Sequence, residues 1–303
     1  MVAFGGNALL PDPLYPSSQG ARARALAGAL KLLNPAGEGM VLVHGNGPQV
    51  GMILLRIEAT RDRIPPEPLD FMVAETQGSI GYLLARTIRS SPGRGSQEVA
   101  AVMTQVLVDS TDPAFSNPTK PVGPYYGEEE AIRLRRVHGW DMASGPRGWR
   151  RTVPSPRPLE VVEMRTIREA AAQGTVVIAG GGGGVPVIRG EGGELLGAEA
   201  VVDKDLTASL IAVALEARRL VILTEVDAVY RGYRGRSPEA VHLLRRGEAC
   251  ELLESGDLPA GSRGPKVEGA LSFAKSAGKE ALITDVDHLE EALSRRAGTW
   301  VLP

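Results

Sequence analysis

Short apolar runs alternate along this chain with stretches in which apolar residues recur at helical spacing. Each run is rich in valine, isoleucine and leucine and ends in glycine or a polar turn. Continuous apolar strands of this kind are typical of parallel sheets that are buried on both faces. The pattern therefore predicts an α/β fold of three layers (α/β/α), with a mainly parallel central sheet between two layers of helices. The predicted strands are residues 1–4, 40–43, 99–108, 175–179, 220–224 and 281–284, and the predicted helices are residues 22–33, 49–61, 76–88, 159–172, 206–217 and 267–277.

A stretch of different composition interrupts this alternation. Residues 109–158 are dense in proline, glycine and aromatic residues and hold two of the three tryptophans. Because large aromatic side chains favour packed surroundings, we expect a small protruding subdomain, or lid, rather than a linker. We expect residues 1–303 to form a single domain that includes it. The glycines within residues 187–202 predict a hairpin that leads into Asp203.

Composition and charge argue against several classes of function. The 303 residues carry a formal net charge of -2, and no run of like charges suggests a nucleic-acid or membrane partner. The first residues lack the pattern of a signal peptide, and no apolar run is long enough to span a bilayer. We therefore expect a soluble, cytoplasmic protein. The only cysteine, Cys250, cannot form an internal disulfide, and its apolar-periodic surroundings predict a buried thiol.

Lysine is scarce in this sequence, which makes its positions informative. Of the 34 lysine and arginine residues only six are lysine, and three of these, Lys120, Lys204 and Lys266, lie in loop-like motifs. An ammonium group on a flexible stem can follow a phosphoryl group as it moves, whereas a guanidinium is a rigid fork. The three lysines are therefore candidates for a phosphoryl-transfer site. The alternative is chance retention at the surface, which explains the other three lysines on predicted helix faces.

Glycine-rich loops directly follow three of the predicted strands. The carboxyl ends of parallel strands share one edge of a sheet, so these loops should converge there. Glycine lets backbone N–H groups approach an anion, which favours a phosphate site, although a single such loop is more often only a tight turn. Neither a G-x-G-x-x-G helix start nor a G-x-x-x-x-G-K-[ST] loop occurs. The loops contain Gly5, Gly6 and Asn7, then Gly45, Asn46 and Gly47, and then residues 180–184.

Two aspartates flank Lys204 at the start of a predicted helix. Asp203 and Asp205 are placed as helix caps, or alternatively Asp205 holds lysines in position for catalysis. The four histidines are dispersed and no cysteines are paired, so no protein metal site is predicted. His44 follows a strand and is interpreted as a hydrogen-bonding residue rather than a base or a metal ligand.

The motifs resemble, nearly from end to end, those of the carbamate kinases within the amino-acid kinase family. Related acetylglutamate-type kinases carry a lysine two residues before the first glycine pair, where this chain has Ala3. In carbamate kinases a lysine of the protruding subdomain supplies that charge, and Lys120 matches its motif. Glu225 and Arg263 depart from the aspartate and the methionine that are usual in the family. The matching motifs include GGNAL (5–9), HGNGPQVG (44–51), ETQG (75–78), NPTKPVGP (117–124), DKDL (203–206), LTEVD (223–227) and GPK (264–266).

This resemblance implies reversible phosphoryl transfer between ATP and carbamate, giving ADP and carbamoyl phosphate, and used in arginine catabolism to make ATP. It also implies Mg²⁺ bound with the nucleotide, and a homodimer. Two alternatives stay open: a related kinase acting on another small acceptor, and a nucleotide-binding regulator without catalysis. The implied roles are catalysis for Lys120, Lys204, Asp205 and Lys266, substrate or phosphate binding for Gly5, Gly6, Asn7, Gly45, Asn46 and Gly47, and nucleotide binding for Asp203, Thr224, Asp227, Tyr230, Gly264 and Lys266.

Overall fold

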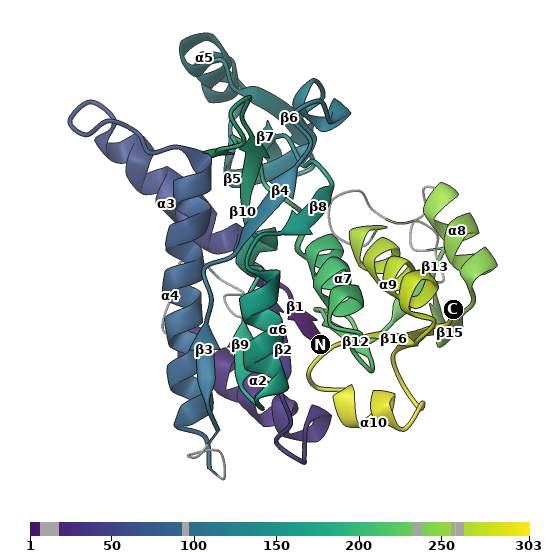
Figure 1. Cartoon of the computed structure of the whole chain (residues 1–303). Coiled ribbons are helices and arrows are strands. Elements are labelled where there is room, and N and C mark those ends of the chain that lie inside the picture. The colour runs from purple at the N-terminus through teal and green to yellow at the C-terminus, as the bar shows by residue number, and fades with distance from the viewer. Residues whose placement is uncertain (7–17, 93–96, 233–237, 256–257, 259–263) are drawn as a thin grey trace.

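A mainly parallel sheet forms the centre of the protein (Figure 1). The computed structural model describes residues 1–6, 18–92, 97–232, 238–255, 258 and 264–303. Within them the strands of this sheet are, in spatial order, β15 (Leu243–Leu244), β17 (Thr299–Val301), β16 (Ala281–Thr284), β12 (Leu220–Leu223), β1 (Val2–Phe4), β2 (Met40–His44), β9 (Val176–Ile178) and β3 (Val99–Ala101). Neighbouring strands are parallel except β16 and β17, which are antiparallel.

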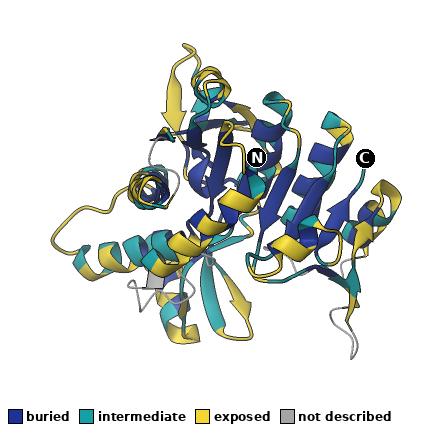
Figure 2. Ribbon diagram, turned by 90° about the horizontal axis from the view of Figure 1, so that it is seen from below, coloured by how far each residue is buried: buried dark blue, intermediate teal, exposed yellow. Residues whose placement is uncertain are grey.

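Helices cover both faces of the central sheet, which confirms the predicted three layers. Successive residues of a strand point to opposite faces, so a strand covered on both sides is apolar throughout. In β2, Val41 and Val43 face the layer that contains α6, α7, α8 and α9, whereas Met40 and Leu42 face α2, α4 and α10. Figure 2 shows the buried strands between helices whose outer surfaces are exposed. The helices are α2 (Ser18–Leu33), α4 (Leu69–Arg89), α6 (Met164–Ala172), α7 (Lys204–Ala214), α8 (Arg246–Glu254), α9 (Gly264–Ala277) and α10 (Leu289–Leu293).

Two of the predicted elements are divided in the structure. The apolar run 99–108 forms β3 and then β4 (Gln105–Val108), which belongs to a different sheet. Between them the N–H of Thr104 donates to Gln77 Oε1 (2.8 Å), and its carbonyl accepts from Gln77 Nε2 (3.0 Å). The spacing of apolar residues within 99–108 does not reveal this contact with a residue distant in the sequence. Similarly, the stretch 159–172 begins in strand β8 (Pro158–Val161), which precedes α6.

Smaller sheets extend from the carboxyl ends of the central strands. In Figure 1 a three-stranded antiparallel sheet and α5 (Glu128–His138) protrude at the top, within the stretch that was expected to form a subdomain. Its spatial order is β5 (Lys120–Tyr126), β7 (Gly148–Val153) and β6 (Asp141–Gly145). A four-stranded sheet contains β11 (Leu195–Gly197), β10 (Val185–Arg189), β4 and β8, and a two-stranded sheet contains β13 (Val229–Arg231) and β14 (Glu239–Val241). The antiparallel pair of β10 and β11 is the predicted hairpin.

The position of Cys250 corrects the prediction that its thiol is buried. Cys250 is exposed, because α8 buries Ala249 and Leu252 instead and turns the intervening position outward. An apolar-periodic pattern fixes the face of a short helix only to within about one position. Among the described helices, none combines the length and the apolar content needed to cross a membrane.

Candidate active site

A cavity of about 270 Å³ lies at the carboxyl ends of the central strands. The loops after β1, β2, β9 and β12 reach it, together with the start of β5 and the first residues of α3 (Gly47–Thr60), α7 and α9. The glycine loops therefore converge as the parallel topology requires. Of the residues predicted from the sequence, those lining this cavity are Gly5, Gly6, Gly45, Asn46, Gly47, Lys120, Asp203, Lys204, Asp205, Thr224 and Lys266.

Two aspartates hold the three lysines at this cavity. Asp205 accepts from both Lys204 Nζ (2.5 Å to Oδ1) and Lys266 Nζ (3.0 Å to Oδ2). Asp203 accepts from Lys120 Nζ (2.6 Å to Oδ2), and its other oxygen caps α7 by accepting from the N–H of Asp205 (2.9 Å). Residues far apart in the sequence thus bring three ammonium groups into one small space.

Burial and pairing set the protonation of this cluster. Burial alone would raise the pKa of Asp205, but Lys204 and Lys266 lower it to about 2. Burial lowers the pKa of Lys204 to about 8 against the attraction of Asp205. For Lys266 burial is outweighed by Asp205, which raises the pKa of its ammonium group. The carboxylate is therefore charged at neutral pH, and Lys204 is the lysine of this pair that titrates most readily.

Helix N-termini and glycine backbones add to the positive character of the cavity. Gly47, Lys204 and Lys266 lie in the first turns of α3, α7 and α9, where unpaired N–H groups favour anions. The first two glycine loops touch, since the N–H of Gly45 donates to the Phe4 carbonyl (2.8 Å). A Cβ on Gly45 would lie 2.4 Å from the Gly6 nitrogen, so no larger residue fits there.

The loop of residues 180–184 lies beside the cavity and is held by hydrogen bonds with neighbouring elements. Gln77 Nε2 donates to the Gly181 carbonyl (3.1 Å), and Thr104 Oγ1 accepts from the Gly180 N–H (2.9 Å). A Cβ on Gly182 would lie 2.1 Å from Asn46 Nδ2, which itself donates to Thr76 Oγ1 (2.8 Å). This support was not predicted as functional, although Thr76 and Gln77 stand in the ETQG motif that carried part of the resemblance.

Some of the predicted residues lie outside this arrangement. Asp227 and Tyr230 do not line the cavity, and Tyr230 Oη donates to Asp227 Oδ1 (2.9 Å). Gly264 begins α9 without lining the cavity. Asn7 and Arg263 lie outside the described residues. Gly182 of the third predicted glycine loop also lines the cavity. Lining residues that the sequence did not single out for the site are Pro48, Val50, Pro121, Val122, Val201 and Val202.

His44 behaves as the hydrogen-bonding residue that was predicted at the end of its strand. Its ring is buried, and its Nδ1 lies 3.2 Å from the Gly45 carbonyl. The pKa of His44 is lowered to about 4, chiefly by burial, with the Gly45 contact acting to raise it and Lys204 acting to lower it. The imidazole is therefore neutral at physiological pH, and the Nδ1–H tautomer can donate to Gly45.

The chain is similar to known proteins over nearly its whole length. The model of the amino acid kinase family matches residues 1–285. The carbamate kinase of Pyrococcus horikoshii is 42% identical, with 100% of this chain and 98% of that protein covered. A solved structure from Aeropyrum pernix K1 has a TM-score of 0.91 at 43% identity, covering 99% of this chain and 98% of that one. The carbamate kinase of Giardia lamblia bound to AMP-PNP has a TM-score of 0.87 at 36% identity, covering 99% and 97%.

Proposed function

Because this chain belongs to the amino acid kinase family, we propose that it transfers a phosphoryl group reversibly between ATP and carbamate, giving ADP and carbamoyl phosphate. Curated carbamate kinases that are 42% and 41% identical over the whole chain support this activity. The observation that carries the proposal is the position of Lys120. It enters the cavity from β5 and joins Lys204 and Lys266, while Ala3 in the middle of β1 supplies no charge.

The site is suited to a reaction that consists mainly of positioning and charge neutralisation. Carbamate is already an anion, so its attack on a phosphoryl group needs no general base. Bringing two anions together in line does require cations and N–H donors fixed in place beforehand. Lys120, Lys204 and Lys266 would neutralise the transferred phosphoryl group, while the loops at Gly5 and Gly45 would hold the carbamoyl end.

We propose that the nucleotide binds near Thr224 and Lys266. Both residues line the cavity, and Asp227 and Tyr230 follow Thr224 in the segment after β12. Asp203 and Asp205 are already engaged by lysines. Mg²⁺ would therefore enter with the nucleotide, bound to its phosphate oxygens, and would offset their negative charge.

Formation of ATP tests this proposal directly. Purified protein given carbamoyl phosphate and Mg-ADP should produce ATP, measured by a luciferase assay. Acetyl phosphate and the acyl phosphate of N-acetylglutamate, tested in its place, would reveal a related kinase with another acceptor. Binding of ADP without ATP formation from any of these donors would instead indicate a nucleotide-binding regulator and contradict the proposed activity.

The lowered pKa of Lys204 predicts an alkaline limit to activity. The kcat/KM for carbamoyl phosphate should fall as the pH rises through about 8, because the free protein then loses the Lys204 proton. Lys204→Arg should be less active overall, but the fall in its kcat/KM should move to higher pH, because a guanidinium stays charged. The measurement is a pH profile of kcat/KM from pH 6 to 10. An unshifted profile in Lys204→Arg would assign the limit to another group.

We propose that the partner of this chain is a second copy of itself, as the family resemblance predicts. Strand β3 is the last strand of the central sheet in the described residues, and α4 packs beside it. Phe71 and Tyr82 of α4 are 60% and 62% exposed, and Met103, which follows β3, is 48% exposed. Exposed large apolar side chains on α4 and just after β3 are suited to burial in a homodimer.

A further inference from the structure

The protruding sheet that carries Lys120 rests on helix α3 through an apolar contact near the cavity. Val50 and Leu54 of α3 belong to the same buried cluster as Val122 of β5 and Val153 of β7. The backbones approach closely here, since a Cβ on Gly51 would lie 3.5 Å from the Cα of the glycine at position 123. An apolar contact of this kind resists separation but has little directional preference, so further contacts are needed to fix the angle of the sheet.

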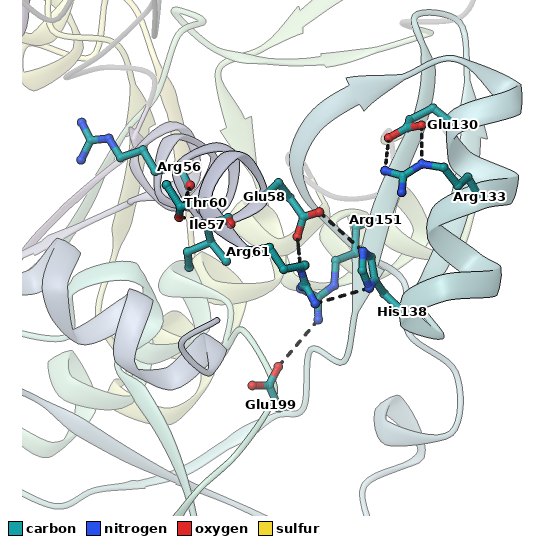
Figure 3. Close-up of polar contacts among 10 residues, drawn as sticks. All are labelled: Arg56, Ile57, Glu58, Thr60, Arg61, Glu130, Arg133, His138, Arg151 and Glu199. Atoms are coloured by element: carbon teal, nitrogen blue, oxygen red, sulfur yellow. Dashed lines mark hydrogen bonds and ion pairs between the residues drawn. The ribbon is translucent and has the colours of Figure 1, made fainter. Parts of the chain in front are cut away.

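A cluster of charged and polar side chains occupies the other end of the interface between α3 and the protruding sheet (Figure 3). We call it the α3 latch and define it as Glu58, Arg61, His138, Arg151 and Glu199. Glu58 Oε1 lies 3.0 Å from Arg61 Nη2, Arg61 Nη1 lies 3.3 Å from His138 Nδ1, and His138 Nε2 lies 3.6 Å from Glu58 Oε2. Arg151 Nη2 lies 3.7 Å from Glu199 Oε2.

Burial distinguishes the latch from an ordinary surface network. The side chains of His138 and Arg151 are 11% and 16% exposed. Trp140 covers them, with its ring 4.5 Å from the Arg151 guanidinium and 5.3 Å from the His138 ring. Burial and the neighbouring Arg61 lower the pKa of His138, so its neutral Nδ1 can accept from Arg61. The Glu199 side chain, in contrast, is 58% exposed, so its attraction to Arg151 is the more solvated part of the latch. The partly buried hydrogen bond from Arg61 to His138 has a preferred direction.

Strand pairing connects the latch to Lys120 over a short distance. On β7, Arg151 is paired with Val122 and Val153 is paired with Lys120. The segment that follows β11 runs alongside and makes contacts in the same order. Glu199 meets Arg151, the N–H of Val201 donates to the Pro154 carbonyl (2.9 Å), and Asp203 accepts from Lys120. A shift of β7 at Arg151 would therefore displace Lys120 from Asp203.

We propose that the α3 latch positions Lys120 for phosphoryl transfer by fixing the protruding sheet against α3 and against the segment 199–203. The expected effect on kcat rests on the proposed function, whereas the expected effect on the position of Lys120 does not. Arg151 is the central positioning residue because it alone in the latch belongs to the strand paired with β5. Displacement of a catalytic group by about 1 Å can cost up to about 100-fold in rate.

Replacement of Arg151 tests the latch through kcat and through the reactivity of Lys120. Arg151→Met keeps an unbranched chain beside Trp140 but removes the guanidinium. We expect kcat for ATP formation to fall about tenfold, with an unchanged KM for Mg-ADP, because the nucleotide contacts lie elsewhere. In a Lys120→Ala background the same substitution should have no further effect. Labelling of Lys120 by an amine-reactive reagent, followed by mass spectrometry, should become several-fold faster than in the wild type.

Arg133→Met is the matched control for this experiment. Arg133 pairs with Glu130 at 2.6 Å, but both residues belong to α5 and are 54% and 44% exposed, so the pair links no two elements. It should change neither kcat nor the labelling of Lys120. If Arg151→Met does not fold, Glu199→Gln serves in its place, since it keeps an acceptor for the Leu69 N–H while removing the charge opposite Arg151.

Two outcomes would overturn the latch. The first is a folded Arg151→Met or Glu199→Gln protein whose kcat and Lys120 labelling match the wild type. The second is an equal loss in Arg133→Met. If the wild type forms no ATP, the proposed function fails, but the labelling rates still decide whether the latch holds Lys120.

Discussion

Replacing Asp205 with asparagine should lower the free energy of unfolding by about 3–5 kcal/mol, the usual cost of removing one partner from a buried ion pair. The Asp205 side chain is 3% exposed and is shared by Lys204 and Lys266. Without its charge, two ammonium groups remain in a space that water reaches poorly. Transfer activity should also be lost, because the lysines are no longer held together. Denaturant unfolding at pH 6 and pH 8 measures the first effect.

The pH dependence of this loss identifies its cause. In the wild type the pKa of Lys204 is lowered to about 8, and removing Asp205 should lower it further. A lysine whose folded-state pKa is depressed gives stability that rises with pH between the folded and unfolded pKa values. As the pH rises, the free energy of unfolding therefore begins to increase at a lower pH in the variant than in the wild type. Its deficit should be largest at pH 6 and smaller at pH 8.

Glu280→Gln is the control for Asp205→Asn. Glu280 pairs with Arg295 at 2.6 Å on a solvated surface, with exposures of 33% and 52%. Its removal should cost no more than about 1 kcal/mol. A cost for Asp205→Asn as small as that of the control, or a deficit independent of pH, would mean that Asp205 does not hold the charged lysines.

The central sheet could be predicted because most of its strands carry their own local signal in the sequence. Strands such as β2 and β16 are buried on both faces, which leaves an uninterrupted apolar run in the sequence. The convergence of the glycine loops follows from parallel topology alone. The division of residues 99–108 could not be predicted in this way, because it depends on Gln77, a polar side chain that reaches Thr104 from another element. Such contacts leave no trace in local periodicity.

Many of the residues that line the cavity could be predicted from the sequence, but most of their pairs could not. The sequence left open whether Asp205 caps a helix, as Asp203 can, or holds lysines in position, and only the fold decides between these roles. Asp203 caps α7 and binds Lys120, which lies 83 positions away, whereas Asp205 binds Lys204 and Lys266. The contacts within the α3 latch could not be predicted. Arg151 stands in a motif that also matches the family, GWRR (148–151), but its neighbours are fixed only when α5 and β7 are placed beside α3.

Replacing Lys120 with alanine should lower kcat for ATP formation by about 100- to 1,000-fold, the usual effect of removing one fixed donor to transition-state charge. The KM for Mg-ADP should change little, because the predicted nucleotide contacts at Thr224 and Lys266 remain. The loss of stability should be smaller than in Asp205→Asn, since Lys120 is the more exposed partner of its pair and Asp203 still caps α7. The measurement is steady-state ATP formation beside thermal unfolding.

Two further variants show whether the charge of Lys120 or its geometry is required. Lys120→Arg keeps the charge on a rigid planar group, so it should restore only part of the lost rate. Lys275→Ala, the same change on the exposed face of α9, should leave kcat unaffected. Wild-type kcat in Lys120→Ala would show that the protruding sheet contributes no catalytic charge. Phosphoryl transfer would then depend on Lys204 and Lys266 alone, and the α3 latch would have no catalytic group to position.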